Sequence, residues 1–393
     1  MPYPQIHLKP ERDLSLRKGH PWLFSGAISH ADPSLVSGDV AEAVSSDGAS
    51  LGIGFFSPDS DIAFRLLSTD PAVTVDRSFW NDRIRRAEEL RAKTVPPGTD
   101  AYRLINSEGD GFPGLVVDRY ADVLVMTVGT AGIEKHRDDI LEALVDGIEP
   151  VTVLERSEGR SRKRERLPDR VGIAHGDDLP DRVDILENGL KFETDPLNGQ
   201  KTGFFLDQRP NREIIRTASQ SLRVLNGFSY TGAFSVYAAA GGAEQVISVD
   251  VSEPACESAV RNLAKNGFSA EHHPVIAGDV FQYLRETDVR FDLIILDPPA
   301  FAKTRADVNK AARGYKDANL QALKRLQPGG FLMTFSCSNH VDADLFMKIV
   351  HGAVRDAGRT GQVIKRLGPG PDHPVLLGHT EGHYLKGLFL RVL

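Results

Sequence analysis

The sequence predicts a multidomain α/β protein whose C-terminal part is a Rossmann-like, doubly wound parallel sheet. From about residue 183 onward, strand-like apolar runs alternate with helix-like amphipathic runs, which is the pattern of parallel strands joined by crossover helices. The start of the chain instead shows short strands separated by turn residues about every 8–12 positions, as in a small β-barrel. Hydrophobic residues make up 41% and charged residues 26% of the 393 positions, which is ordinary for a soluble globular protein and excludes a disordered chain.

Residues 1–72 are predicted to form the β-barrel. Its strand-like runs are bounded by pairs of turn-forming residues, which indicate tight connections rather than helices. The strands are expected at 22–24, 39–44, 50–56 and 62–67, and the turns at Ser37-Gly38, Asp47-Gly48 and Ser57-Pro58.

Residues 73–182 are predicted to form a small α+β domain. Apolar residues recur at helical spacing from 76 to 94, and Pro96-Pro97-Gly98 ends that helix. Strands at 115–118, 123–128 and 151–154 and a helix at 133–145 follow. The stretch 156–170 contains seven Lys or Arg against three acidic residues and is expected to be an exposed basic loop.

Residues 183–393 are predicted to form the doubly wound domain. Its expected strands are 223–226, 245–250, 274–277, 291–297 and 330–336. They alternate with expected helices at 232–240, 254–266, 280–285, 309–326 and 342–356, and two further strand-like runs follow at 362–367 and 384–393. Ligands of such sheets bind at the carboxyl ends of the strands, where the strand order reverses.

Charge, hydropathy and cysteine content limit the class of protein. The net charge of −7 does not favour nucleic-acid binding, but a local basic face such as the one containing Lys18 can still meet phosphates. No apolar run approaches the ~18 residues of a membrane span, and the N-terminus has no apolar signal segment. Two cysteines, Cys256 and Cys337, are too few for a disulfide framework, so we expect a cytoplasmic protein.

The first strand-to-helix turn of the C-terminal domain, residues 226–234, suggests the cofactor. It contains Gly227 and Gly232 but lacks the third glycine of a dinucleotide-binding turn, which packs backbone amides around a pyrophosphate. S-adenosylmethionine (SAM) has no phosphates and needs one close backbone approach and a ribose acceptor. Asp250 ends the second strand, where it can accept from ribose hydroxyls, and Asp279 follows the third strand, where it can reach the adenine amino group. Each of these residues alone fits ordinary turn chemistry; together they favour SAM.

The fourth and fifth strands end in candidate catalytic residues. Asp297 follows a buried apolar strand, a costly place for a charge without a task, and Pro298 and Pro299 would stiffen a pocket wall for a planar base. Cys337 ends the next strand; a lone cysteine is more often a small buried apolar residue, but this one lies where substrate must bind. A thiolate adding to C6 of cytosine would activate C5 toward the SAM methyl group, with Asp297 sharing a proton with ring N3. Cys256 falls within a helix and is expected to be structural.

The chain resembles a known family, the bacterial 23S rRNA cytosine-C5 methyltransferases with an N-terminal PUA domain. The resemblance covers nearly the whole chain and is weakest in the middle domain. The matching stretches are 15–26 (SLRKGHPWLFSG), 201–209 (KTGFFLDQR) with Asn211-Arg212, 228–234 (FSYTGAF), 297–299 (DPP), 313–316 (RGYK), 334–338 (TFSCS), 372–374 (DHP) and 384–387 (YLKG). The resemblance implies a class I SAM methyltransferase fold behind a PUA-type barrel and the small α+β domain.

The resemblance also implies roles for single residues. Cys337 would be the nucleophile, Asp207, Gln208 and Arg209 would lie near the methionine tail of SAM, and the PUA and middle domains would form an RNA platform. The residues themselves predict Asp297 as the catalytic partner of Cys337. The remaining cofactor-binding residues predicted are Asn226, Gly227, Phe228, Thr231, Gly232, Asp250 and Asp279. The expected RNA-binding residues are Pro298, Pro299, Arg162, Lys163, Arg164 and Lys18, and no metal is expected. The chain departs from the family at Ala300, where a polar residue often stands, and it has no second cysteine beside the fourth strand, so the base that takes the C5 proton is unassigned.

The expected partner is 23S rRNA, either naked or in a ribosome assembly intermediate, with no membrane, and the resemblance implies that homodimers occur. Three alternatives stay open at this stage. A SAM-dependent enzyme could modify a guanine or another base of rRNA or tRNA without a cysteine nucleophile. A nicotinamide dehydrogenase is disfavoured by the missing glycine, and a non-catalytic RNA-binding module is disfavoured by the intact acidic residues and Cys337.

Overall fold

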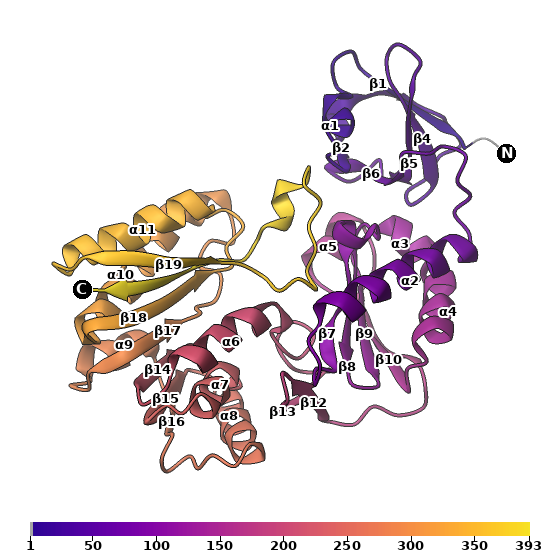
Figure 1. Ribbon diagram of the computed structural model, residues 1–393. Coiled ribbons are helices and arrows are strands. Elements are labelled where there is room, and N and C mark those ends of the chain that lie inside the picture. The colour runs from indigo at the N-terminus through magenta and orange to yellow at the C-terminus, as the bar shows by residue number, and fades with distance from the viewer. Residues whose placement is uncertain (1–2) are drawn as a thin grey trace. The chain divides into compact units, whose positions relative to one another are not determined.

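The computed structural model describes residues 3–393, which divide into two compact units (Figure 1). Unit 1 comprises the chain up to Ile185 together with Thr194–Phe204 and Pro371–Gly382. Unit 2 comprises Leu186–Glu193, Phe205–Gly370 and His383–Leu393. Met1 and Pro2, part of the segment expected to have no secretory signal, lie outside the described residues. The domain boundaries after residues 72 and 182 stay predictions.

The N-terminal part of unit 1 is a six-stranded sheet with the order β2-β6-β5-β4-β1-β3. Its strands are β1 (Gln5–Leu8), β2 (Trp22–Phe24), β3 (Ile28–Ala31), β4 (Val40–Val44), β5 (Ser50–Phe56) and β6 (Ile62–Ser68), and the short helix α1 (Leu14–Arg17) follows β1. β1 pairs in parallel with β4, and the other pairs are antiparallel. Ile6, Leu23 and Phe64 are fully or almost fully buried in its core. The four strands expected here are confirmed.

The middle part of unit 1 is a five-stranded sheet with the order β11-β10-β9-β8-β7, packed against helices. The strands are β7 (Ala101–Asn106), β8 (Leu115–Tyr120), β9 (Val123–Val128), β10 (Thr152–Ser157) and β11 (Arg170–His175), and the helices are α2 (Arg77–Thr94), α3 (Ala131–Lys135), α4 (Arg137–Ile148) and α5 (Arg160–Arg164). Asp76 caps α2 by accepting a hydrogen bond from the Phe79 amide. The single helix expected at 133–145 is two helices that meet at His136.

Two segments distant in sequence complete unit 1. In Thr194–Phe204, Thr202 donates a hydrogen bond to Asp118 at 2.5 Å, and the buried Tyr120 hydroxyl accepts from the Phe204 amide at 3.2 Å. In Pro371–Gly382, the Asp372 carboxylate accepts from the Arg103 amide at 3.1 Å, and its carbonyl accepts from the buried Arg91 guanidinium at 2.9 Å. Both segments are therefore held by buried or half-buried polar contacts that belong to unit 1.

Unit 2 is built on a seven-stranded sheet with the order β16-β15-β14-β17-β18-β20-β19. Its strands are β14 (Arg223–Gly227), β15 (Gln245–Asp250), β16 (Val275–Ala277), β17 (Phe291–Leu296), β18 (Leu326–Ser336), β19 (Gly361–Leu367) and β20 (Lys386–Val392). β14 to β18 are parallel, and β20 is antiparallel to β18 and to β19. A separate two-stranded sheet consists of β12 (Val183–Glu187) and β13 (Leu190–Thr194).

Helices cover both faces of the seven-stranded sheet (Figure 1). α6 (Arg209–Ala218), α7 (Ala233–Ala240) and α8 (Glu253–Lys265) are neighbours in one layer, and α9 (Val280–Glu286), α10 (Val308–Arg325) and α11 (Ala343–Asp356) are neighbours in the other. Burial on both faces explains why β17 is almost continuously apolar. The predicted doubly wound sheet is confirmed, and the strand order reverses at β14, which lies between β15 and β17. No helix among residues 3–393 is long and apolar enough to cross a membrane.

Candidate functional site

The candidate site lies at the carboxyl edge of the parallel strands of unit 2. Asn226 and Gly227 end β14, Asp250 ends β15, Asp297 follows β17 and Cys337 follows β18. Because these strands are parallel and adjacent, their carboxyl ends meet at one edge of the sheet. The fold therefore gathers at one edge residues that are up to 111 positions apart, from Asn226 to Cys337.

The turn after β14 has a strained backbone. Phe228, Tyr230 and Gly232 have φ values of 60°, 47° and 75°, in a region of backbone conformation that residues other than glycine rarely adopt. Such strain persists where the surroundings fix it, and it gathers at ligand sites. A Cβ at Gly227 would lie 2.9 Å from a Val280 methyl group, so this position accepts only glycine without rearrangement. The buried Thr231 has its carbonyl fixed by a hydrogen bond from the Asn262 amide group at 2.9 Å.

The carboxylate of Asp250 is held by the backbone. Its Oδ2 accepts from the Tyr230 amide at 2.8 Å, and its Oδ1 accepts from the Ser252 amide at 2.9 Å. Each carboxylate oxygen has a second lone pair for another donor. The side chain is half-buried and therefore reachable, so it can accept hydrogen bonds from a vicinal diol such as that of ribose.

Two buried polar atoms near this turn test whether the site fits a polar cofactor. Asn226 Oδ1 and Ser229 Oγ have no hydrogen-bond partner within residues 3–393, although Asn226 donates through its amide nitrogen to Ser235 Oγ at 2.8 Å. Buried polar atoms are normally paired, so unpaired ones at a strained turn call for a ligand or an ordered water. The donors and acceptors present here fit the ribose and amino-acid groups of SAM.

Asp279 has a structural task as well as its expected one. It is the N-cap of α9, and its Oδ1 accepts from the Gln282 amide at 2.8 Å. The side chain is exposed after β16. One of its oxygens is committed to the helix, and its contact with adenine stays a prediction.

The segment 207–209 is buried and connects two parts of the site. Asp207 Oδ2 accepts a hydrogen bond from the Tyr384 hydroxyl at 2.6 Å. Gln208 Nε2 donates to Asp297 Oδ2 at 3.0 Å, and its Oε1 accepts from Asn211 at 2.6 Å. The expected contacts of residues 207–209 with the methionine tail of SAM stay predictions. Arg209, at the start of α6, is 2% exposed. The Gln208 side chain thus reaches the candidate catalytic carboxylate.

Cys337 lies in a turn that is fixed against the loop after Asp297. Its thiol is half-buried, with Sγ 3.9 Å from the Pro298 carbonyl oxygen. Ser338 Oγ accepts from the Ala302 amide at 3.1 Å and is hydrogen-bonded to the Tyr315 hydroxyl at 2.9 Å. Burial raises the pKa of Tyr315, so this hydroxyl stays neutral. Pro298 is buried and Pro299 is exposed, so the two prolines form a stiff wall with one open side.

Cys256 has the structural role expected of it. It lies in α8, it is 7% exposed, and its Sγ is 3.5 Å from the Asp250 carbonyl oxygen. Burial raises the pKa of this thiol, which disfavours the reactive thiolate.

The expectation of a loop at 156–170 is wrong, although most residues of this stretch are exposed as expected. This stretch forms the end of β10, the helix α5 and the start of β11. Arg162 is completely buried: its guanidinium donates to Glu134 at 2.7 Å, to the Val128 carbonyl at 3.0 Å and to the Pro168 carbonyl at 2.6 Å. It cannot contact RNA phosphates in this conformation. Lys163, Arg164 and Lys18 are exposed and stay candidates.

Three contacts were not visible in the sequence. Tyr315, Tyr384 and Lys386 lie in the stretches 313–316 and 384–387, which suggested a resemblance but no role. Lys386 is buried, and its Nζ donates to the Ser338 and Val341 carbonyls, both at 2.6 Å. The partners of Tyr315, Tyr384 and Lys386 lie 23 to 177 positions away in the sequence, so no local pattern predicts these contacts.

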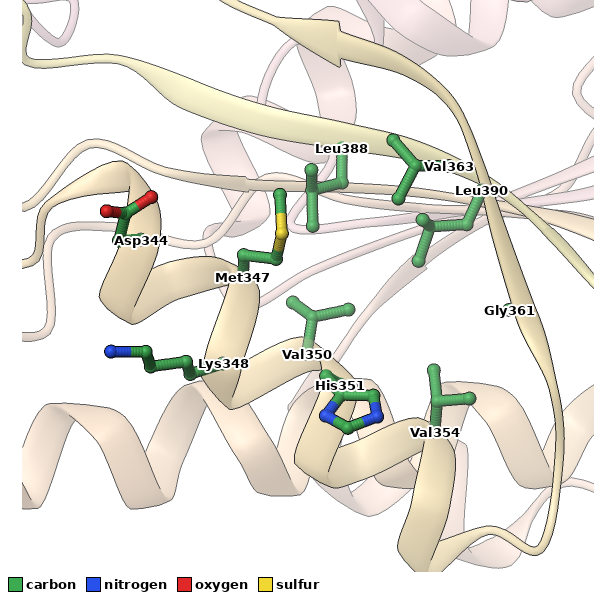
Figure 2. Close-up of a pocket in the computed structure, with 10 residues that line it drawn as sticks. All are labelled: Asp344, Met347, Lys348, Val350, His351, Val354, Gly361, Val363, Leu388 and Leu390. Atoms are coloured by element: carbon green, nitrogen blue, oxygen red, sulfur yellow. The ribbon is translucent and has the colours of Figure 1, made fainter.

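An apolar hollow in unit 2 contains none of the predicted site residues. It has a volume of about 350 Å³ and lies between α11 and the strands β19 and β20 (Figure 2). Met347, Val350, Val363, Leu388 and Leu390 point into it from these elements. Val363 is 48% exposed on the edge strand β19.

Two family models match this chain. A family model described as S-adenosylmethionine-dependent methyltransferase matches residues 104–389, and one described as PUA-like domain matches residues 6–69. The expected cofactor, SAM, is thereby confirmed. Two solved structures share the fold: a SAM-dependent methyltransferase from Streptococcus mutans, 24% identical with a TM-score of 0.83, and a methyltransferase in complex with SAH, 24% identical with a TM-score of 0.84. Each match covers 98% of this chain and 99% of the other.

Curated relatives match along the whole chain. The Ribosomal RNA large subunit methyltransferase I of Alteromonas mediterranea is 43% identical over 392 residues, which cover 99% of this chain and 98% of the relative. The protein of the same name from Shewanella frigidimarina is 44% identical over 393 residues, which cover 99% of both chains. The chain therefore belongs to the S-adenosylmethionine-dependent methyltransferase family, within the group of ribosomal RNA large subunit methyltransferases I.

Proposed function

We propose that this enzyme methylates C5 of a specific cytosine in 23S rRNA and that Cys337 forms a transient covalent bond with C6 of that cytosine. The observation that carries the proposal is a half-buried thiol directly after β18, next to β17, which Asp297 follows. The names of the relatives support ribosomal RNA of the large subunit as the substrate class.

Cys337 supplies the activation that cytosine C5 needs. The thiolate adds to C6, and the C5–C6 electron pair makes C5 nucleophilic enough to take the methyl group. A base then removes the C5 proton, the S–C6 bond breaks, and the thiolate is restored. The turn around Cys337 is fixed by Ser338 and Tyr315, so the sulfur is held in position before the substrate arrives.

Asp297 holds the edge of the base. Its carboxylate can accept a hydrogen bond from the exocyclic amine and share a proton with N3 as charge develops on the ring. The hydrogen bond from Gln208 orients Oδ2, and Pro298 and Pro299 restrict the loop that follows. The Gln208 amide thus acts on the base through Asp297.

SAM supplies an electrophilic methyl group when it is bound. Asp250 would hold the ribose, Asn226 and Ser229 have unpaired buried oxygens for its polar groups, and the strained turn at Gly227–Gly232 lets the backbone approach closely. Phe228 packs edge-to-face on Phe281, with ring centroids 5.9 Å apart, and would form an apolar wall.

Unit 1 would bind the RNA around the target nucleotide. Lys18, Lys163 and Arg164 are exposed cations that can meet phosphates. We further propose that the enzyme acts in the cytoplasm, on naked 23S rRNA or an assembly intermediate, and that it can form homodimers.

The experiment that tests the proposal is mass mapping of methylated nucleosides in 23S rRNA from cells with and without the gene. We expect the loss of one 5-methylcytidine, restored by the wild-type gene and by Cys256→Ala but not by Cys337→Ala. Loss of a methylguanosine instead would favour the alternative, a SAM-dependent enzyme that modifies another base without a thiolate. No change in any rRNA or tRNA nucleoside would favour an RNA-binding module without catalysis.

A further inference from the structure

A buried lysine lies directly beside the turn that contains Cys337. Lys386 is the first residue of β20 and pairs with Ser336, the last residue of β18, in the antiparallel ladder. Its side chain is in the interior, with 8% of the residue exposed. Lys386 therefore lies opposite the residue that immediately precedes the proposed nucleophile, Cys337.

Both hydrogen bonds found for this ammonium go to backbone carbonyls. Its Nζ donates to the Ser338 carbonyl and to the Val341 carbonyl, each at 2.6 Å. Lysine is almost never buried unless it is paired, because removing an ammonium from water is costly. The two bonds close the turn that begins immediately after Cys337, and they leave a third N–H for another acceptor.

The electrostatics of the cluster link this ammonium to the thiol. Burial lowers the pKa of Lys386, whereas Cys337 and Asp342 favour its charged form. An interaction between two titratable groups is reciprocal, so an ammonium that is favoured by a thiolate also favours that thiolate.

The other titratable groups around the turn do not supply a second buried positive charge. Asp342 caps α11 by accepting from the Leu345 amide at 2.7 Å. Tyr315 stays neutral, since burial raises its pKa, and His340 is exposed in the same turn. Asp297, at the end of β17, would oppose a second negative charge nearby. Among the buried members of this set, Lys386 is the cation.

We propose that Lys386 is a positioning residue that closes the turn after Cys337 and stabilises the thiolate form of that cysteine. The proposal rests on the proposed function, in which Cys337 is the nucleophile. Its consequence is a thiol that ionises at a lower pH than a free cysteine, before RNA and SAM bind.

The test is the pH dependence of Cys337 alkylation by iodoacetamide in the full-length enzyme, without RNA or SAM. Peptide mass spectrometry separates the rate at Cys337 from that at buried Cys256, which serves as an internal control. The range from about pH 6 to about pH 10 brackets an ordinary thiol pKa of about 8.5. We expect a midpoint below 8.5 for the wild type.

Two substitutions separate charge from shape. Lys386→Met keeps the length of the side chain but removes the charge, and we expect the midpoint to rise by about one unit, with about tenfold slower alkylation below both midpoints. Lys386→Arg keeps the charge and should keep the midpoint close to that of the wild type. A folded Lys386→Met enzyme with an unchanged midpoint would overturn the proposal.

The wild-type enzyme alone also tests the proposal, in case Lys386→Met does not fold. The native midpoint is compared with that of the same enzyme unfolded in urea, and a native value equal to or above the unfolded one overturns the proposal. Methyl transfer to 23S rRNA by Cys337→Ala is measured separately. If that variant stays active, the proposed nucleophile is wrong, even where the alkylation midpoint depends on Lys386.

Discussion

Gln208 donates a hydrogen bond from Nε2 to Asp297 Oδ2 at 3.0 Å, although the two residues are 89 positions apart. The same amide accepts from Asn211 through its Oε1, so both ends of the Gln208 side chain are engaged. The glutamine is 1% exposed, whereas Asp297 is half-buried and accessible from the site. Through this bond, the segment between β13 and α6 supports the Asp297 carboxylate.

Replacing Gln208 should separate a role in substrate chemistry from a role in cofactor binding. We expect Gln208→Ala to lower kcat for methylation of an rRNA transcript by about tenfold or more, because a hydrogen bond to a charged group contributes about 1.5–3 kcal/mol. The dissociation constant of SAM, measured by calorimetry, should stay unchanged. Gln362→Ala, on the exposed face of β19, is the matched control. Weaker SAM binding with unchanged kcat would return Gln208 to the methionine tail.

Removing the Asp250 carboxylate should weaken SAM binding. Asp250→Ala loses an acceptor that two backbone amides hold in place, and we expect the dissociation constant of SAM to rise by about tenfold or more. Asp288→Ala, an exposed aspartate before β17, serves as the control. Calorimetry that gives equal affinities for the Asp250→Ala and wild-type enzymes would exclude the ribose contact.

A covalent adduct with RNA should depend on Cys337. In a transcript with 5-fluorocytidine, the C5 position has no proton to lose after methyl transfer, so the S–C6 bond should persist. We expect a slow-migrating protein–RNA band in denaturing gels for the wild type and for Cys256→Ser. Cys337→Ser should bind RNA and SAM but give no such band, and an adduct in that variant would contradict the mechanism.

Arg162 should contribute to stability rather than to RNA affinity. Arg162→Met leaves the Val128 and Pro168 carbonyls without this donor and removes one of the two arginine partners of Glu134, which keeps its bond from Arg170. We expect a loss of about 1–3 kcal/mol in the free energy of unfolding, because buried carbonyls lose their donor. Denaturant titration measures this loss, and an unchanged free energy of unfolding together with weaker RNA binding would contradict it.

The exposed cations nearby should behave in the opposite way. We expect the double substitution Lys163→Ala and Arg164→Ala to leave the free energy of unfolding within about 0.5 kcal/mol of the wild type. If both residues meet phosphates, the slope of log affinity for rRNA against log salt should fall by about one for each contact. A binding titration at several salt concentrations measures the slope. An unchanged slope would make them solvated surface residues, and Lys18→Ala tests the N-terminal sheet in the same way.

The strands of unit 2 could be predicted because burial on both faces makes them apolar. Their functional residues lie at or just after the carboxyl ends, where the apolar runs stop. This is why Asp250, Asp297 and Cys337 are recognisable from the sequence. The role of Arg162 could not be predicted, because the sequence of a basic run does not show which of its arginines face water and which bind buried carbonyls. The Lys386 contacts depend on the antiparallel pairing of β20 with β18, and the chain before β20 passes through unit 1. Local sequence patterns do not predict such a pairing. Similarly, the break at His136 leaves an apolar pattern that reads as one helix.

The two inserted segments of unit 1 have a consequence for dissecting the protein by truncation. A fragment that begins after residue 185 would still contain Thr202 and Asp372, but it would lack Asp118, Arg91 and Arg103, which satisfy them. A fragment that ends there would in turn leave the buried Arg91 and Tyr120 with fewer partners. No single cleavage point yields both units intact, so limited proteolysis should release fragments that stay associated, and isolated halves should unfold at lower denaturant concentration than the whole chain.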